Sequence, residues 1–329
     1  MSIIAGTTTS YAPVRGIRED LEDVIWELFP EDTWALSNLD KVDATQQFHE
    51  WQTDTLAGAT ANRQIEGDDA SFSTLNATTR VGNYLQISRK TFLVSGSVEA
   101  SKMAGRKSEL ARNARKLMRE LKRDMEQALV GNQASSAGGV ATARSCGGME
   151  SWIAGPTQNP GTSGNAVRST TTAQGTTAPF GSNVVASPTD STTTGALSKT
   201  ALDSALQGAW EQGGNPRIIM TGAIGKAAID GFTSIATRFV DIDVAEAPII
   251  GAANVYVSDF GRHTVILHRY VRSRTVLCLD PEYWAVAYLR RPFVEPLAKT
   301  GDGEKRQMLT EFTLVSRNYL ASAKVTEIA

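Results

Sequence analysis

The stretch SELARNARKLMRELKRDMEQALVGN, residues 108–132, decides the fold class of this 329-residue chain. Apolar side chains recur in it, and just before it, at spacings of four or seven residues: Met103, Leu110, Leu117, Leu121, Met125 and Leu129. Basic side chains fill most of the other positions. This pattern predicts an amphipathic helix with one buried side, while its other sides meet water or partners.

Capping residues predict where this helix begins and ends. A start at Ser97, with Glu99 in the first turn, and an end at Gly131 give about 34 residues, or about 50 Å at about 1.5 Å per residue. Gly105 then either kinks the helix or marks its true start. The apolar repeat lasts little more than three heptads, which favours docking on a sheet over a coiled coil.

Charge is nearly balanced over the whole chain but not along its length. The formal net charge is -2, yet residues 1–70 hold fourteen acidic and four basic side chains. Residues 71–131 hold twelve basic and five acidic side chains. The two sections are either solvated faces of separate elements or surfaces through which neighbouring copies attract each other.

Composition is that of an ordinary globular protein, with 41% hydrophobic and 21% charged residues. The two cysteines, Cys146 and Cys278, lie far apart in sequence and indicate neither a disulfide framework nor a thiolate metal site. Nowhere do about 18 apolar residues follow one another, the length typical of a membrane span. We therefore expect a soluble protein that is not exported and has no membrane partner.

The segments before the long helix predict an arm and a hairpin. Apolar residues in the arm mark a short amphipathic helix that Pro30 ends: Leu21, Val24, Ile25 and Leu28. Residues 46–56 and 82–94 have strand character, and a long polar tip separates them. An isolated two-stranded ribbon is marginal in water, so this hairpin needs support from elsewhere.

The segments after the long helix predict a mixture of helices and strands. Residues 132–198 contain only four charged side chains and are dominated by Gly, Ser, Thr and Ala, as in a loop-rich insertion. Residues 198–214 then read as a helix, and short apolar segments up to residue 316 read mostly as strands. The fold class is therefore α+β, with a long helix on a mixed or antiparallel sheet and a second helix-and-strand domain.

Several stretches match part of a catalytic or metal-binding motif, but each lacks a residue that the motif requires. HEWQT starts like a zinc-protease helix, but Thr53 stands where the second histidine belongs. TGAIGKA lacks the first glycine of a phosphate loop, and SDFGR, a turn between two strands, lacks the rest of a kinase signature. DIDVAE has Glu246 where a calcium loop needs glycine. The three histidines are too scattered for a triad: His49, His263 and His268. The sequence predicts no enzyme and no cofactor.

The order of the predicted elements and the amino-acid sequence of several stretches resemble those of a known family. These stretches are APVRGIREDLEDVIWELFPEDTW, FHEWQTDTLA, GNYLQISRKTFLVSGSVE, ELKRDMEQALVGNQ, NPRIIMTG, VYVSDFG, LDPEYWAVAYLR and LAKTGDGEKRQMLTEFTL. Together they resemble the major capsid proteins of tailed bacteriophages with the Hong Kong 97-type fold. The resemblance extends over nearly the whole chain except the Gly/Ser/Thr-rich section.

The resemblance implies five parts of that fold, each with a range in this chain. They are an N-terminal arm at 1–43, an extended hairpin loop at 44–95, a spine helix of the peripheral domain at 96–132, an axial domain with the Gly/Ser/Thr-rich insert at 133–270, and C-terminal strands at 271–329 that return to the peripheral domain. The spine helix would lie across a sheet, and the arm and the loop would embrace neighbouring subunits.

The resemblance also implies a function and partners. Copies of the chain would form the pentamers and hexamers of an icosahedral head that encloses double-stranded DNA, assembled in the bacterial host cytoplasm and present in the virion. A portal and a decoration protein would be partners. We expect a separate scaffolding protein, because only about 95 residues precede the spine. No lysine occurs between Lys41 and Lys90, so the isopeptide cross-link of the fold's founding member is not expected.

Two groups of residues are expected to make intermolecular contacts. Phe48 and Trp51 should anchor the base of the loop, and four charged residues should meet a neighbour at its tip: Arg63, Glu66, Asp68 and Asp69. On the helix, three basic residues should face packaged DNA or an acidic neighbour: Arg112, Arg115 and Arg119. The alternative is a nucleic-acid-binding protein that uses this basic helix, although interleaved aromatic residues for base stacking are missing.

Overall fold

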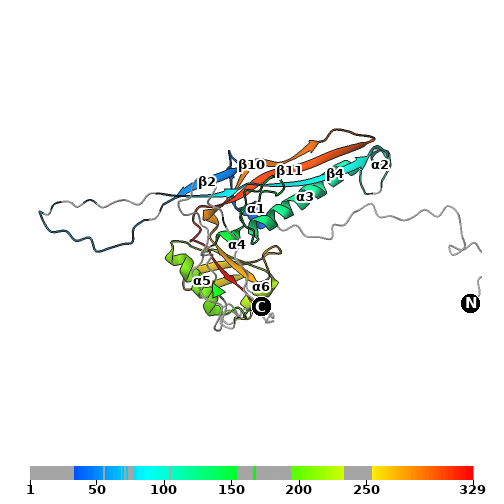
Figure 1. The fold of residues 1–329 in the computed structure, drawn as a ribbon. Helices are drawn as coiled ribbons and strands as arrows, with labels where there is room; N and C mark the ends of the chain where they lie inside the picture. Colours follow the sequence, from blue (N-terminus) through cyan, green and yellow to red (C-terminus); the bar gives the residue numbers. More distant parts are fainter. Residues whose placement is uncertain are drawn as a thin grey trace, which may run out of the picture.

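The computed structural model describes residues 33–54, 56–67, 69, 72, 78–103, 105–153, 166–167, 185, 194–232 and 254–328. In these ranges the strands form a four-stranded, a six-stranded and a two-stranded sheet. Figure 1 shows an elongated upper layer, a rounder body beneath it, and a long loop that extends away from both on one side. No helix in the described part of the chain combines the length and apolar character needed to cross a membrane.

The upper layer is the four-stranded sheet with the long helix on one face (Figure 1). Its strand order is β1 (Asp40–Asp43), β10 (Trp284–Pro296), β11 (Gly303–Ser316) and β4 (Gln86–Ser95). β1 runs parallel to β10, whereas β10, β11 and β4 pair antiparallel. The sequence predicted a mixed or antiparallel sheet, and the structure shows a mixed one.

The long helix is shorter than predicted. Helix α2 (Gly96–Ala100) is separate from α3 (Glu109–Val130), which has 22 residues. The Ser108 hydroxyl caps α3 by accepting from the Ala111 N–H at 3.1 Å, and Gly105 has a φ of +71°, a left-handed conformation that interrupts the helix. A single helix over 96–132 is therefore wrong, the alternative in which the helix starts only after Gly105 agrees with the structure, and its predicted end at Gly131 is confirmed.

Burial of the apolar stripe increases toward the end of α3. The side chains of Leu121, Met125 and Leu129 are fully buried, whereas Leu117 is only half-buried. They belong to a core cluster that continues through Trp284 of β10 into the lower body. The second half of α3 therefore holds the two bodies together, while its first half is more open to solvent.

The predicted hairpin divides between two sheets. β2 (Phe48–Thr53) pairs antiparallel with β3 (Thr79–Tyr84), and β4 leaves to join β11. The break falls at Leu85, which is fully buried and donates its N–H to the Gln47 carbonyl at 3.0 Å. Residues 82–94 are thus not one strand, and 44–95 is not one hairpin.

The lower body is built on the six-stranded sheet. Its order is β5 (Ala166–Val167), β12 (Ala323–Thr326), β9 (Thr275–Leu279), β6 (Ile218–Thr221), β8 (Gly261–Leu267) and β7 (Val255–Ser258). Helices α5 (Lys199–Glu211) and α6 (Ala223–Asp230) pack against it in the same core cluster. Three short elements complete the described parts: α1 (Trp34–Asn38), α4 (Met149–Trp152) and a 3-10 turn, Pro281–Tyr283.

The C-terminal range 271–329 does not return as a whole to the long helix. β9 and β12 lie inside the six-stranded sheet, and only β10 and β11 join the four-stranded one. Every residue of β9 is buried, as expected for an apolar run at the centre of a sheet with neighbours on both edges. The predicted boundary at 271 thus separates strands that pair with each other.

Candidate assembly surfaces

The base of the extended loop is fastened to its own subunit. Phe48 is only 5% exposed, and its ring centroid lies 4.5 Å from that of Tyr84. It rests against Gly82, where an added Cβ would lie 2.5 Å from the ring. Trp51 is half-buried, with its ring 5.4 Å from the ring of Trp152. The side chain of Phe48 is thus enclosed within its own subunit and leaves little surface for the contact with a neighbouring subunit that the sequence predicts.

Beyond this base the loop offers apolar side chains that its own subunit does not cover. Leu56 and Phe72 are each 98% exposed, and Ile65 is 79% exposed. Sequence reasoning stressed the charges of the tip and missed these three residues, although each is a large apolar side chain isolated in a polar segment. Figure 1 shows that the loop projects well beyond β2 and β3.

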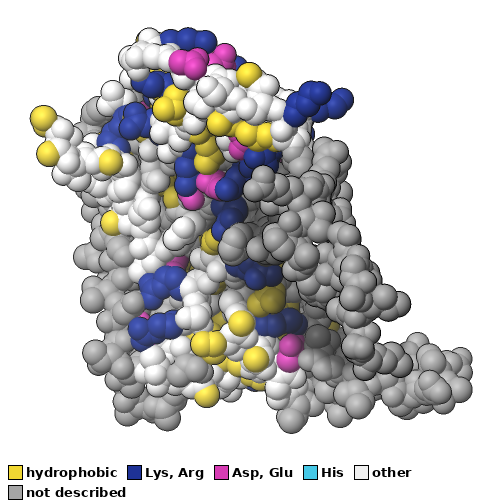
Figure 2. All heavy atoms as spheres, turned by 90° about the vertical axis from the view of Figure 1, so that its right-hand side faces the viewer, with side chains coloured by type: hydrophobic (Ala, Val, Ile, Leu, Met, Phe, Trp, Pro, Cys, Tyr) yellow, Lys and Arg dark blue, Asp and Glu magenta, His cyan; other side chains and the backbone are white. Residues whose placement is uncertain are grey.

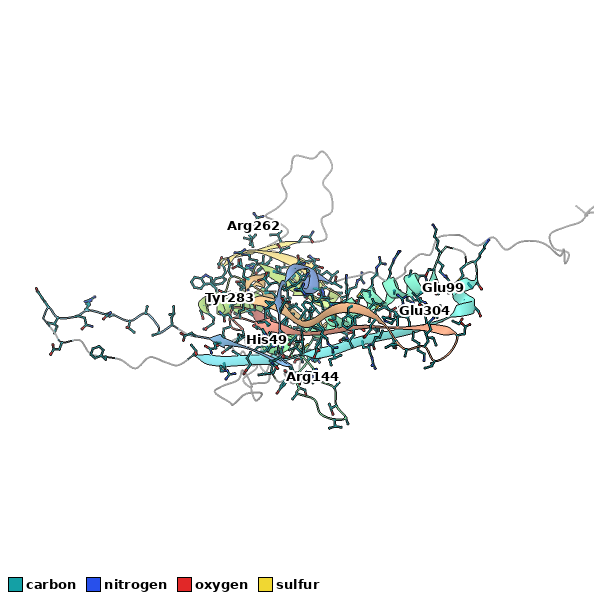
Figure 3. All side chains as sticks on the ribbon, turned by 90° about the horizontal axis from the view of Figure 1, so that it is seen from above. His49, Glu99, Arg144, Arg262, Tyr283 and Glu304 are labelled. Atoms are coloured by element: carbon teal, nitrogen blue, oxygen red, sulfur yellow. The ribbon has the colours of Figure 1, made fainter. Side chains whose placement is uncertain are left out.

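The predicted charged tip is placed in part. Arg63, Glu66 and Asp69 are all exposed on the loop, whereas Asp68 lies outside the described residues. Figure 3 shows the loop at one end of the molecule, and Glu99 and Glu304 at the opposite end. Among the described residues, the loop and the far end of the four-stranded sheet thus lie at opposite ends.

The far end is built from α2, β4 and β11. Glu99 of α2 accepts hydrogen bonds from the first N–H groups of α3, those of Glu109 at 3.0 Å and Leu110 at 3.1 Å. A hydrogen bond from Ser108, together with these N–H groups, lowers the pKa of Glu99. An open pocket lies beside this junction, and its lining includes Leu93, which is 61% exposed.

Basic side chains follow one face of α3. Arg115, Arg119 and Lys122 are exposed, and Arg112 is partly exposed and pairs with Glu109 at 3.4 Å. Arg115 and Lys122 have no hydrogen-bond or ion-pair partner among the described residues. The three predicted residues therefore do lie together on the helix surface, and Lys122 extends their row.

A turn of the lower body that carries basic residues is tied to α3, although two of these residues, Arg272 and Arg274, pair with Glu150 at 3.3 Å and Glu327 at 2.6 Å. The Arg123 Nε donates to the Tyr270 hydroxyl at 2.8 Å, which ties α3 to the turn that follows β8. This turn carries three further basic residues that sequence reasoning missed, although they stand within six positions: Arg269, Arg272 and Arg274. Figure 2 shows Lys and Arg side chains distributed from the top to the lower part of the face that it views.

A buried carboxylate on α3 holds the start of α1. Glu126 is fully buried and accepts from the N–H groups of Ala35 at 2.6 Å and Leu36 at 3.0 Å. The Nε2 of His268 lies 3.1 Å from the same carboxylate, and the His268 Nδ1 accepts from the Tyr270 N–H. The imidazole proton therefore sits on Nε2, and a negative charge faces the positive end of the helix dipole of α1.

Side chains that could act in catalysis or metal binding have structural roles in the described ranges. Within them, no group of three or more His, Cys, Asp and Glu side chains could hold a metal ion. Burial raises the pKa of both thiols, Cys146 and Cys278, to about 12. The Ser258 hydroxyl lies 2.7 Å from the His263 Nε2, but this pair closes the turn between β7 and β8, where His263 is buried. The predicted turn at SDFGR is confirmed.

The comparison with known families decides which family the chain belongs to. The model of the SU10 major capsid protein family matches residues 3–329. The chain belongs to this family. It is also similar to a major capsid protein of Escherichia phage Phieco32, with 35% identity over 108 residues. That alignment spans 32% of this chain and 31% of the length of that relative.

Solved structures show that this capsid-family chain has the predicted fold. A chain of the capsid asymmetric unit of cyanophage A-1(L) has a TM-score of 0.65 at 15% identity, covering 98% of this chain and 99% of that one. A chain of the capsid of a native GTA particle has a TM-score of 0.62 at 9% identity, with coverage of 98% and 99%. The α+β, Hong Kong 97-like fold predicted from the sequence is confirmed, in a family of structural capsid proteins and not of enzymes.

Proposed function

We propose that this chain is the head protein of a tailed bacteriophage, whose copies assemble as pentamers and hexamers into an icosahedral shell around double-stranded DNA. Membership of the major capsid protein family supports this proposal. The shell is assembled in the cytoplasm of the host bacterium. A scaffolding protein, a portal and a decoration protein are the partners that such a shell requires.

The observation that carries the proposal is the apolar content of the extended loop. Leu56, Ile65 and Phe72 stand almost fully in water on a segment that projects from the subunit. Burying one large apolar side chain contributes about 1.5–3 kcal/mol, so three contribute about 5–9 kcal/mol per loop. Ordering the loop offsets part of this gain. A closed shell engages many such loops at once, and the combined contacts hold it together.

The two opposite ends of the described residues suit a head-to-tail contact. The loop projects from one end, and the other end presents the junction of α2, β4 and β11, with Leu93 exposed beside a pocket (Figure 3). A contact between two different surfaces of identical copies closes into a ring when the rotation fits. Pentamers and hexamers are rings of this kind.

The alternative function, binding of nucleic acid through the basic helix, is supported by the exposed row of Arg115, Arg119 and Lys122. Phosphate binding by such a row is nonspecific and weakens steeply with salt. A shell lining that contacts packaged DNA would use the same residues. Both functions therefore use the same basic residues. They differ in whether the chain assembles into a shell.

The test is assembly of the purified chain, alone and with co-expressed scaffolding protein, followed by negative-stain microscopy and sedimentation. Replacing the apolar trio by serine (Leu56→Ser, Ile65→Ser and Phe72→Ser) should leave folded subunits that form no shells. The matched control places serine at polar positions of the same loop, Asn62→Ser and Gln64→Ser, and should assemble like the wild type. Shells formed by the apolar-trio variant, or a wild-type chain that stays a monomer and binds DNA sequence-specifically, would contradict the proposal.

The charged tip is tested separately by its salt dependence. Replacing Asp68 and Asp69 by lysine should weaken shell formation at low salt, because partly exposed charges act over about 8–10 Å near physiological ionic strength. Light scattering during assembly, measured from low to high salt, follows this effect. If the variant and the wild type differ equally at every salt concentration, the tip does not act through charge.

A further inference from the structure

The anchored carboxylate of α3 lies on the same helix face as the basic row. Counting from Arg112, the positions of Arg115, Arg119, Lys122 and Glu126 follow at intervals of 3, 7, 10 and 14 residues. Residues with this spacing form one stripe along a helix. The stripe is basic over its first four members and ends in the acidic Glu126, where α1 begins.

The chain therefore enters α1 at the C-terminal end of the basic stripe. The segment immediately before this entry is EDLEDVIWELFPED, residues 19–32, which carries seven acidic and no basic side chains. It also carries apolar side chains at helical spacing, among them Leu21 and Leu28. On α3, Ala114 and Met118 lie half-buried beside the basic stripe and offer apolar contacts.

We propose that residues 19–32 dock along the basic stripe of α3 in the same subunit. The lengths agree: Glu126 lies 14 positions after Arg112, or about 21 Å at about 1.5 Å per residue. The acidic segment also has 14 residues, so it covers the stripe even if it is helical, and reaches farther if it is extended. The anchor at Glu126 keeps this segment at high effective concentration beside the stripe.

Under the proposed function, the basic stripe of α3 contacts either DNA or a neighbouring subunit. The docking proposed here assigns the stripe to residues 19–32 of the same chain. Only the consequence of this docking for the shell rests on the proposed function. In the shell, α3 would then be neutralised by its own arm, and packaged DNA would not be held by this helix. The contact itself forms in an unassembled subunit and is tested there.

Reciprocal charge reversal is the first test. The readout is hydrogen exchange of residues 19–32 in unassembled full-length subunits at low salt. Arg112→Glu, Arg115→Glu and Arg119→Glu together should speed exchange about tenfold, because several partly exposed ion pairs are lost at once. The arm variant, with Glu19, Asp20, Glu22 and Asp23 replaced by lysine, should do the same. Combining both sets should restore slow exchange. Exchange that is unchanged by either set, or not restored by the combination, overturns the proposal.

Cross-linking is the second test, and it separates the occupants. The segment ends at its anchor beside Glu126, so it runs parallel to α3 and places Glu22 near Arg115. Glu22→Cys with Arg115→Cys, treated with a short bis-maleimide, should give an internally linked monomer, because both native cysteines are buried and unreactive. The control pair Glu22→Cys with Gln127→Cys, off the stripe, should react far less.

Other products of the cross-linking overturn the proposal. Linked dimers would show that the arm of a second copy occupies the stripe. Absence of any link, together with DNA that protects the Arg115→Cys thiol from labelling, would show that DNA occupies it. Shell formation by the wild type is scored in a separate experiment, so failure to assemble contradicts the proposed function and leaves the docking result intact.

Discussion

Replacing Glu126 by alanine should destabilise the subunit more than any change at an exposed charge of α3. The carboxylate is fully buried and accepts from two N–H groups at 2.6 and 3.0 Å and faces the His268 Nε2 at 3.1 Å. Alanine leaves these donors buried without an acceptor, and each such donor costs about 1–3 kcal/mol. Removing one member of a buried charged network typically costs about 3–5 kcal/mol in total.

Replacing Glu126 by glutamine removes the charge of the side chain but keeps its shape, so it shows how much of the stability depends on the charge. Glu126→Gln keeps one acceptor oxygen but turns an amide NH2 toward the second donor, so we expect a loss of about 2–3 kcal/mol. The matched control is Glu120→Ala on the same helix, whose side chain is partly exposed and lies 3.9 Å from Lys116. Its loss should stay below about 1 kcal/mol.

The assay is urea denaturation of unassembled subunits, combined with hydrogen exchange at the amides of Ala35 and Leu36. Glu126→Ala should lower the denaturation midpoint at an unchanged slope, and it should remove protection from these two amides first. If the midpoint moved no more than in Glu120→Ala, the carboxylate would not be a stabilising anchor. If the midpoint fell while both amides stayed protected, the anchor of α1 would lie elsewhere.

Three further outcomes are expected. Gly82→Ala should lower the thermal midpoint, because the new Cβ would lie 2.5 Å from the Phe48 ring and overpacking costs about 1–3 kcal/mol. Leu121→Asp should give insoluble protein because its side chain is fully buried, whereas Leu117→Asp, at a half-buried position, should stay soluble. Burial lowers the pKa of His263, so the unfolded chain takes up the proton first, and stability should fall as the pH drops below about 6.5. Denaturation at pH 7.5 and 5.5 should show a smaller difference in His263→Gln.

Local chemistry predicted most elements but not their partners. The end of α3 at Gly131 and the burial of Leu121, Met125 and Leu129 follow from capping and from helical periodicity. The alternation over residues 82–94 continues across Leu85 without a break, so it cannot show that β3 pairs with β2 while β4 pairs with β11. Register and partner choice depend on which face is buried, and distant segments decide this.

The start of α3 was ambiguous for a related reason. Ser97 and Ser108 are both good N-cap residues, and Glu99 suits the first turn of a helix that begins at Ser97. In the structure Glu99 instead accepts from the first N–H groups of α3, across the interruption around Gly105. One carboxylate can serve either helix, and only the position of the interruption in space decides between them.

The same limit separates Phe48 from Leu56 on the extended loop. Both are apolar residues in polar, strand-like sequence, yet Phe48 is 5% and Leu56 is 98% exposed. Phe48 is enclosed because β3 places the bare backbone of Gly82 opposite it, which leaves room for the ring. The loop beyond Thr53 has no such partner strand in its described residues, so its apolar side chains stay in water. Contacts within the subunit, and not the residue type, decide whether an apolar side chain of this loop is buried, like Phe48, or stays exposed for a neighbour, like Leu56.

The sign of charge along α3 carries more information than its total. Four basic residues and then Glu126 occupy one stripe, and the stripe changes sign at the turn where the N–H groups of α1 meet it. A carboxylate suits the N-terminus of a helix, and basic groups suit an acidic segment. Residues 19–32 come just before α1 in the chain. If they dock along α3, their acidic side chains meet the basic residues, and the N–H groups of α1 then meet Glu126. A duplex running along the same stripe would meet favourable charge only over its basic part.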